Sequence, residues 1–173
     1  AVFDAAYKEE ISKEEKLLGK ASKLAKVSGK AHVVSVAGID DIKVNIASCC
    51  KPVPGDRIVG YITKGNGINV HRMVCPNIAN TNERLIEVNW NENNEKFPTT
   101  ILVHAGLNND LLLAIVAKAA NNDIGVKSVN NTKDIDSQSI EMTVVVKSRA
   151  ELLKFMNDIK MLEAVTEVER LIT

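Results

Sequence analysis

Residues 49–77 read CCKPVPGDRIVGYITKGNGINVHRMVCPN, from Cys49 to Asn77, and this stretch decides the fold of the first half of the chain. Pro52 and Pro54 predict a rigid turn. The β-branched run 58–63 and the short run 68–71 predict two strands. The Lys-Gly-Asn-Gly sequence at 64–67 joins them in a tight turn, because Gly and Asn tolerate positive φ. A short helix is predicted over Cys75–Ala79, with Pro76 in its first turn.

The regions on either side extend this unit. The β-branched, partly alternating runs 32–36 and 42–46 predict two strands before the cysteines, and 85–90 predicts a last strand after them. Residues 1–30 are rich in Lys, Glu, Leu and Ala, lack Pro, and predict a helical segment or linker. We therefore assign residues 31–90 to a first domain.

A second domain follows a polar stretch without apolar residues, 91–96, which we interpret as a linker. Its expected elements are strand 99–105, helix 110–120, strand 126–129, an alternating strand 140–147, a helix and strand 165–172. In the first helix Leu112, Ile115, Val116 and Ala119 recur at helical spacing. Ser148 and Glu151 form a capping box before the second, whose expected buried face is Leu152, Phe155, Met156 and Ile159.

The predicted fold class is α+β, with a small α/β domain followed by a ferredoxin-like βαββαβ domain over 97–173. This element order gives one antiparallel sheet with both helices on the same face. The other face of the sheet remains available to a partner, and a homodimer through this sheet is one candidate.

Composition narrows the classes of function. The chain has 173 residues with no net charge, 45% hydrophobic and only 3% aromatic, which favours an aliphatic core. Residues 1–30 carry seven basic and five acidic side chains, 31–90 carry six and five, and 91–173 carry nine and twelve. A strongly basic nucleic-acid binder would look different, so any RNA contact must depend on a few placed cations. Three cysteines, no membrane-length apolar run and no signal peptide predict a cytoplasmic protein.

The stretch from Cys49 to Asn77 closely resembles the zinc-finger-like, or ribosome-inter-subunit, domain of long RelA/SpoT homologues. In that family this domain precedes a C-terminal ACT domain of βαββαβ order, so the resemblance covers roughly 30–173. It implies the regulatory, non-catalytic C-terminal region of a (p)ppGpp synthetase/hydrolase of the stringent response. The family role implies binding to the ribosome (rRNA) and deacylated tRNA, and control of catalytic domains upstream in the same protein.

Two positions depart from the family pattern. Val74 stands where the family often has Asp before the last cysteine. Ligand-binding ACT domains usually carry Gly in the turn before their first helix, where this chain has Asn108, Asn109 and Asp110. The Asp110 carboxylate would repel a ligand carboxylate, which disfavours amino-acid sensing. Sensing and dimerisation by the ACT domain remain the alternatives to ribosome binding.

The candidate metal ligands are Cys49, Cys50, His71 and Cys75. Tetrahedral zinc accepts three thiolates and one imidazole. His71 and Cys75 are four positions apart and can lie on one face of a helix or in one turn. A turn before Pro52 could point the side chains of both Cys49 and Cys50 toward the metal. The alternative is that the cysteines are small buried hydrophobic residues.

The candidate RNA-binding residues are Lys51, Arg57, Lys64 and Arg72, which lie on turns near the cysteines. They could contact phosphates of rRNA or tRNA, whereas the alternative for each is ordinary solvated surface charge. Lys64 is the strongest candidate because its Gly-rich turn exposes backbone N–H groups. A Cys/His nucleophile pair would need an orienting residue and an oxyanion site, for which the sequence has no compact support.

Overall fold

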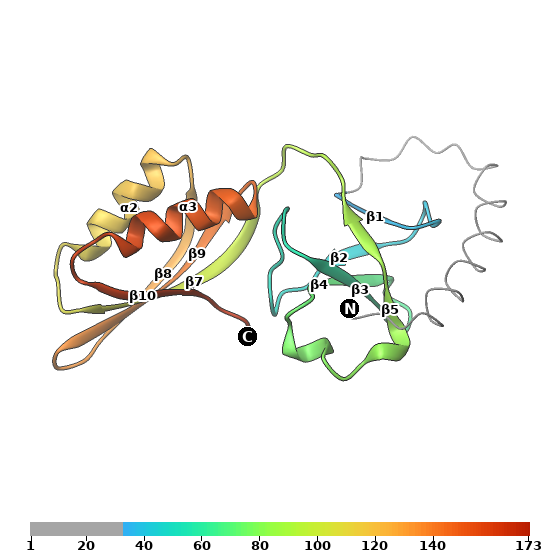
Figure 1. Cartoon of the computed structure of the whole chain (residues 1–173), viewed down its shortest axis with the longest axis horizontal. Helices are drawn as coiled ribbons and strands as arrows, with labels where there is room; N and C mark the ends of the chain where they lie inside the picture. The colour runs from blue at the N-terminus through green and yellow to red at the C-terminus, as the bar shows by residue number, and fades with distance from the viewer. Residues whose placement is uncertain (1–32) are drawn as a thin grey trace. The chain divides into compact units, whose positions relative to one another are not determined.

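The computed structural model describes residues 33–173, and Figure 1 shows its elements. The helix predicted over 1–30 lies outside the described residues. The described residues form two compact units. The first contains the residues up to Ser48 together with Arg57–Asn93, and the second contains Cys49–Asp56 together with Asn94–Thr173. The short segment Cys49–Asp56 therefore packs with the C-terminal residues.

Two small sheets build the first unit. The larger has the order β2-β4-β3-β5, and a two-stranded sheet pairs β1 with β6. Their bounds are β1 Val34–Val36, β2 Val44–Ile46, β3 Ile58–Ile62, β4 Ile68–Arg72, β5 Leu85–Ile86 and β6 Val88–Trp90. Strands β3 and β4 form an antiparallel hairpin, whereas β2 runs parallel to β4. The predicted hairpin over 58–71 is present.

The predicted single strand 85–90 is divided in two. Residues of β5 pair with β3, and residues of β6 pair with β1 in the other sheet. Glu87 separates the two strands, so the chain changes sheets at this residue. The change lets both sheets share one aliphatic core, made of Val34, Val36, Ile68, Val70, Ile86 and Val88. Burying this cluster stabilises the unit, because apolar side chains removed from water favour the folded state.

Two short 3-10 helices lie between the hairpin and β5: η2 (Pro76–Ile78) and η3 (Asn82–Arg84). The first corresponds to the helix predicted over 75–79. Cys75 is its N-cap and Pro76 its first residue, where a missing N–H costs nothing.

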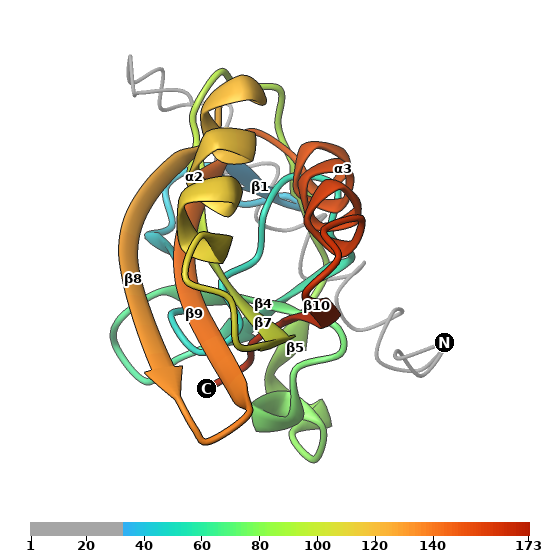
Figure 2. The same cartoon turned by 90° about the vertical axis from the view of Figure 1, so that its left-hand side faces the viewer.

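The second unit has the predicted βαββαβ order, and Figure 2 shows it from a direction at right angles to that of Figure 1. Its elements are β7 Phe97–Gly106, α2 Leu111–Asn121, β8 Gly125–Lys133, β9 Ser137–Val146, α3 Arg149–Lys160 and β10 Val165–Arg170. All neighbours in the sheet order β10-β7-β9-β8 pair antiparallel. Both helices cover the same face of this sheet, as Figures 1 and 2 show. This is the ferredoxin-like arrangement that the sequence predicts.

The two helices differ in how closely the apolar pattern of their sequence matches the residues that the structure buries. In α3 all four predicted core residues are buried, from Leu152 to Ile159. In α2 the buried residues are Leu111, Ile115 and Ala119, so the buried stripe repeats every four residues. Of the four apolar residues that recur at helical spacing in the sequence, Ile115 and Ala119 are buried, whereas Leu112 is half-buried and Val116 exposed because they lie at the flank of that stripe. Neither described helix is long and apolar enough to cross a bilayer.

The capping box is present in altered form. The Ser148 hydroxyl accepts a hydrogen bond from the Glu151 amide at 3.2 Å, as predicted. The Glu151 carboxylate accepts from the Lys147 amide at 2.6 Å, one residue before the cap. Both bonds occupy amides that would otherwise lack partners near the start of α3.

Candidate functional site

A tight turn positions the two neighbouring cysteines. Pro54 and Gly55 occupy its central positions, Gly55 has a φ of 98°, and the Asp56 amide donates to the Val53 carbonyl at 2.9 Å. These are the features of a type II turn. Just before it Lys51 has a φ of 43°, a left-handed conformation that few non-Gly residues adopt. This conformation, directly after Cys50, turns the chain sharply at the cysteines.

His71 and Cys75 come from the far end of the β3–β4 hairpin. His71 belongs to β4 and lies opposite Val59 of β3. A turn follows, in which the Cys75 amide donates to the Arg72 carbonyl at 2.9 Å. His71 and Cys75, four positions apart, are therefore brought together by a turn and not by one face of a helix.

The structure gathers all four predicted ligands. The ligand atoms of Cys49, Cys50, His71 and Cys75 lie within 4.8 Å of one another. Cys50, Cys75 and His71 are buried, Cys49 is half-buried, and the cysteines are thiols. A tetrahedral zinc site with Zn–S bonds of about 2.3 Å needs ligand atoms about 3.8 Å apart. The set therefore fits a zinc ion after a contraction of about 1 Å at most.

Burial prepares His71 for metal binding. Desolvation lowers the pKa of His71 from its usual value of 6.5, because a charged imidazolium is disfavoured away from water. The neutral imidazole is the form that binds a metal. The environment of His71 therefore favours the required protonation state at neutral pH.

The predicted RNA-binding cations do not form one patch. Arg57 precedes β3, and its carbonyl accepts from the Met73 amide at 2.9 Å, so it lies beside Arg72 at the end of the hairpin near His71. Lys64 lies in the turn at the opposite end. Strands of five residues separate the two ends, a distance of about 17 Å at about 3.4 Å per residue. Arg57 and Lys64 are exposed and Arg72 is half-buried.

Lys51, the fourth predicted cation, makes a contact within the second unit. Its Nζ donates to the Thr100 hydroxyl on β7 at 2.6 Å. The lysine is half-buried there. A phosphate would have to compete with this hydrogen bond for the Lys51 ammonium.

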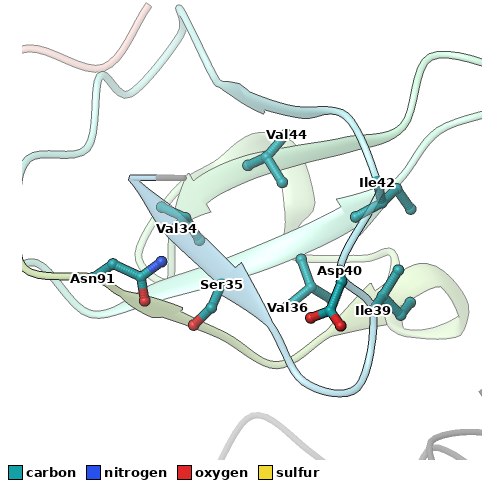
Figure 3. A pocket seen from close by; sticks show the side chains of 8 residues that line it. All are labelled: Val34, Ser35, Val36, Ile39, Asp40, Ile42, Val44 and Asn91. Atoms are coloured by element: carbon teal, nitrogen blue, oxygen red, sulfur yellow. The ribbon is translucent and has the colours of Figure 1, made fainter. Parts of the chain in front are cut away.

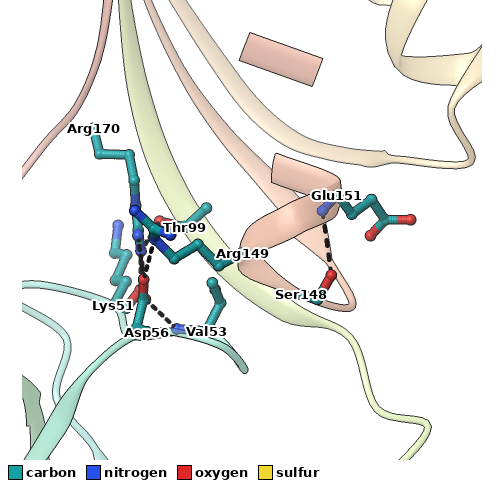
Figure 4. Close-up of polar contacts among 8 residues, drawn as sticks. All are labelled: Lys51, Val53, Asp56, Thr99, Ser148, Arg149, Glu151 and Arg170. Carbon is teal, nitrogen blue, oxygen red and sulfur yellow. Dashed lines mark hydrogen bonds and ion pairs between the residues drawn. The ribbon is translucent and has the colours of Figure 1, made fainter. Parts of the chain in front are cut away.

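Asp56, Arg149 and Arg170, which are shown in Figure 4, have no role that the sequence predicts. Arg170, at the end of β10, donates from Nη1 and Nη2 to the two oxygens of Asp56 at 2.7 and 3.0 Å. Arg149 Nε lies 3.7 Å from the same carboxylate. Asp56 was part of the quoted motif, but no sequence pattern marks its partners, which lie about 90 and 110 residues later.

The turn before α2 holds Asn108, Asn109 and Asp110, all exposed. Asp110 is the N-cap of α2, although its side chain makes no capping bond. The buried Gln138 amide donates to the carbonyls of Gly106 and Asn108 at 3.1 and 3.0 Å, which fixes the shape of the turn. Val74, the other departure from the family pattern, has a largely exposed side chain.

Two of the pockets in the described part of the chain lie in the first unit. One, of about 170 Å³, is lined mainly by aliphatic side chains of the β1 region, with Ser35, Asp40 and Asn91 as its polar groups (Figure 3). A second pocket, of about 470 Å³, is polar and is formed by Tyr61 and residues 80–84. Neither includes any of the four cysteine and histidine ligands. The cysteine–histidine cluster is therefore the best-defined candidate site in the described part of the chain.

Comparisons with known proteins agree with this architecture. Residues 34–91 match the family model of the RelA/SpoT RIS domain, and residues 93–170 match that of the ACT domain. The chain is 37% identical over 145 residues to a GTP pyrophosphokinase of Haemophilus influenzae, covering 80% of this chain and 20% of that protein. It is 32% identical over 145 residues to a GTP pyrophosphokinase of Escherichia coli, with the same coverage. The chain thus spans about a fifth of the length of these relatives.

Among solved structures, the crystal structure of the ACT domain from GTP pyrophosphokinase of Chlorobium tepidum is similar to 44% of this chain and 99% of that one. The sequence identity is 18% and the TM-score 0.41. Together, the two matched domains, in this order, and the curated relatives identify the family. The chain belongs to the RelA/SpoT family, as a C-terminal regulatory region that contains a RIS domain and an ACT domain.

Proposed function

We propose that this chain is the ribosome- and tRNA-binding regulatory region of a (p)ppGpp synthetase/hydrolase. The catalytic activity named in its relatives would then belong to the four-fifths of those proteins that this chain does not match. The chain would restrain or release catalytic domains in the same protein, according to whether deacylated tRNA is bound at the ribosome. The observation that carries the proposal is the ordered pair of RIS and ACT matches over 34–170.

The RNA contact of this proposal lies on the β3–β4 hairpin. Arg57 and Arg72 form one cationic group at the end near His71, and Lys64 forms a second in the turn. Two phosphate contacts about 17 Å apart suit an extended RNA backbone, in which positioning contacts come from Arg, Lys and backbone N–H groups. Lys51 would contribute only by leaving Thr100.

Cosedimentation with ribosomes, with and without deacylated tRNA, tests the proposal. Changing Arg57 and Lys64 to Ala removes two exposed cations, one from each group, and should weaken binding and flatten its salt dependence through lost counterion release. The matched control is Lys154→Ala with Lys160→Ala, which removes two exposed cations from α3. Equal loss in both double variants would refute the placement on the hairpin and indicate a bulk charge effect.

We also propose that Cys49, Cys50, His71 and Cys75 bind one structural zinc ion. When bound, zinc would crosslink the four side chains and stabilise the folded chain, because a ligand specific to the native state raises stability. Reduced, purified protein should contain about one zinc per chain, and adding zinc to the metal-free form should raise the melting temperature. An unchanged melting temperature would refute a structural metal.

Dimerisation is a second candidate function, favoured by apolar exposure on the second unit. Leu113 is 72% exposed on α2, and Val116 is exposed on the same helix. On the edge strand β8, which contacts α2, Val126 and Val129 are also exposed. A dimer through this edge would cover these side chains. Sedimentation equilibrium should show a dimer that Leu113→Lys dissociates, and a monomer at high concentration would exclude it.

Amino-acid sensing is the remaining alternative, and the turn before α2 disfavours it. The Asp110 carboxylate stands at the N-terminus of α2, where a ligand carboxylate would otherwise be attracted by backbone N–H groups. Calorimetry with valine or leucine should show no micromolar binding.

A further inference from the structure

We propose that Arg170 is a positioning residue for the metal centre. Through the Asp56 carboxylate and the Lys51 carbonyl, it fixes the segment that carries Cys49 and Cys50. The proposal rests on the proposed zinc site and adds to it a residue from the last strand of the ACT domain, nearly a hundred residues beyond the last ligand.

The contact between Arg170 and Asp56 is buried and has two-point geometry. The two guanidinium nitrogens of Arg170 each donate to one Asp56 oxygen, at 2.7 and 3.0 Å. The side chains are only 8% and 4% exposed. Paired N–H donors match a carboxylate in both direction and spacing, which a lysine ammonium cannot do. Asp56 also accepts from the Val53 amide at 2.8 Å, so the ion pair holds the turn after the cysteines.

Further contacts hold the backbone next to the cysteines themselves. Arg170 Nη2 donates to the Lys51 carbonyl at 3.2 Å, and Lys51 Nζ donates to Thr100. The Thr173 amide donates to the Cys49 carbonyl at 2.8 Å. The Cys49 carbonyl, directly before Cys50, and the Lys51 carbonyl, one residue after it, are thereby attached to the C-terminal strand region.

The conformation of Lys51 gives these contacts a consequence. Its φ of 43° is unfavourable for a side chain with a Cβ, and such conformations persist only where the surroundings enforce them. Without Arg170, Lys51 can relax toward negative φ. That rotation lies directly after Cys50 and would displace its thiol from the other ligands.

Arg170 contributes one side-chain bond to the sheet of the second unit, from Nη2 to the Thr99 hydroxyl on β7 at 3.3 Å. Strand β10 pairs with β7 through backbone bonds and buries Val168, while Arg170 is its last residue. Losing the Arg170 side chain should therefore release the cysteine segment and leave the sheet in place. Outer-shell partners that orient metal ligands typically change metal affinity about 10- to 100-fold when mutated.

The test measures zinc affinity of the whole chain by competition with a chromophoric chelator. Arg170→Gln should weaken binding by about 10- to 100-fold, Asp56→Asn should weaken it similarly, and Arg170→Lys should have an intermediate effect. The matched control is Lys160→Gln, which removes an exposed cation of the same unit and should leave affinity unchanged. With cobalt in place of zinc, every variant should show the same tetrahedral spectrum at saturation, because the ligands are unchanged.

Hydrogen exchange gives an independent measurement on metal-free protein. In Arg170→Gln the amides of Val53 and Asp56 should exchange faster, while those of β7 and β9 keep wild-type rates. The role of Arg170 would be overturned if, in both Arg170→Gln and Asp56→Asn, the amides of residues 53 and 56 exchanged at wild-type rates and the zinc affinity were unchanged. Failure of the wild-type chain to bind zinc at all would instead refute the metal centre, and this proposal with it.

Discussion

Alanine in place of Gly67 should destabilise the first unit more than alanine in place of Gly65, although both glycines lie in the same turn. Both have positive φ, 78° and 94°, so each alanine has a conformational cost of about 1–2 kcal/mol. The two sites differ in their surroundings. A Cβ at Gly67 would lie 2.1 Å from the Lys43 carbonyl oxygen, whereas a Cβ at Gly65 has no atom within 4 Å.

The clash at Gly67 also damages a strand pairing. The Lys43 carbonyl accepts from the Ile68 amide at 2.9 Å, next to the first residue pair of the parallel β2–β4 ladder. Moving that carbonyl away breaks a hydrogen bond with a net value of about 1 kcal/mol. Gly67→Ala should therefore lose about 2–3 kcal/mol in total and Gly65→Ala about 1–2 kcal/mol.

Urea denaturation followed by fluorescence measures this difference. Trp90 is the single tryptophan, and it packs against the aliphatic core of the first unit. Its signal therefore reports on the unit that contains both turns. Equal midpoints for the two variants, with equal slopes, would refute the argument, because only the contact with Lys43 separates them.

Other predictions concern pH and helix capping. The pKa of His71 is lowered in the folded chain, so the unfolded chain takes up a proton first as pH falls below the usual value of 6.5. The contribution of His71 to folding stability is therefore present above that pH and is lost below it. The urea concentration at the denaturation midpoint of metal-free protein should decrease as the pH is lowered from about 7.5 to about 5.5. His71→Gln should show a smaller fall, and an identical pH profile would contradict this. Ser148→Ala should destabilise α3 by about 1 kcal/mol in thermal unfolding followed by circular dichroism, while Ser148→Asp keeps a cap acceptor and should lose much less. Equal losses for these two variants would argue against a capping role.

Sequence patterns predicted the local elements best where the chain itself imposes them. Two glycines set the turn between β3 and β4, alternation predicted β9, and the cap at Ser148 predicted the start of α3. Each depends on residues within a few positions of one another. Helical spacing alone does not select the buried stripe of α2, because a helix with apolar residues at 111, 112, 113, 115 and 116 has several faces that could be buried. Only packing on the sheet selects one.

The sequence by itself determined the composition of the candidate site and the order of the two domains. The metal-binding chemistry of cysteine and histidine predicted the four ligands, and the βαββαβ order of elements predicted the fold of the second domain. Only the tertiary structure decided which distant residues hold the segment that carries Cys49 and Cys50. The ion pair of Asp56 with Arg170 spans 114 positions in the chain. No local preference encodes such a contact, because it depends on how the final strand of a sheet is placed, and that placement comes from burying the apolar face beneath both helices.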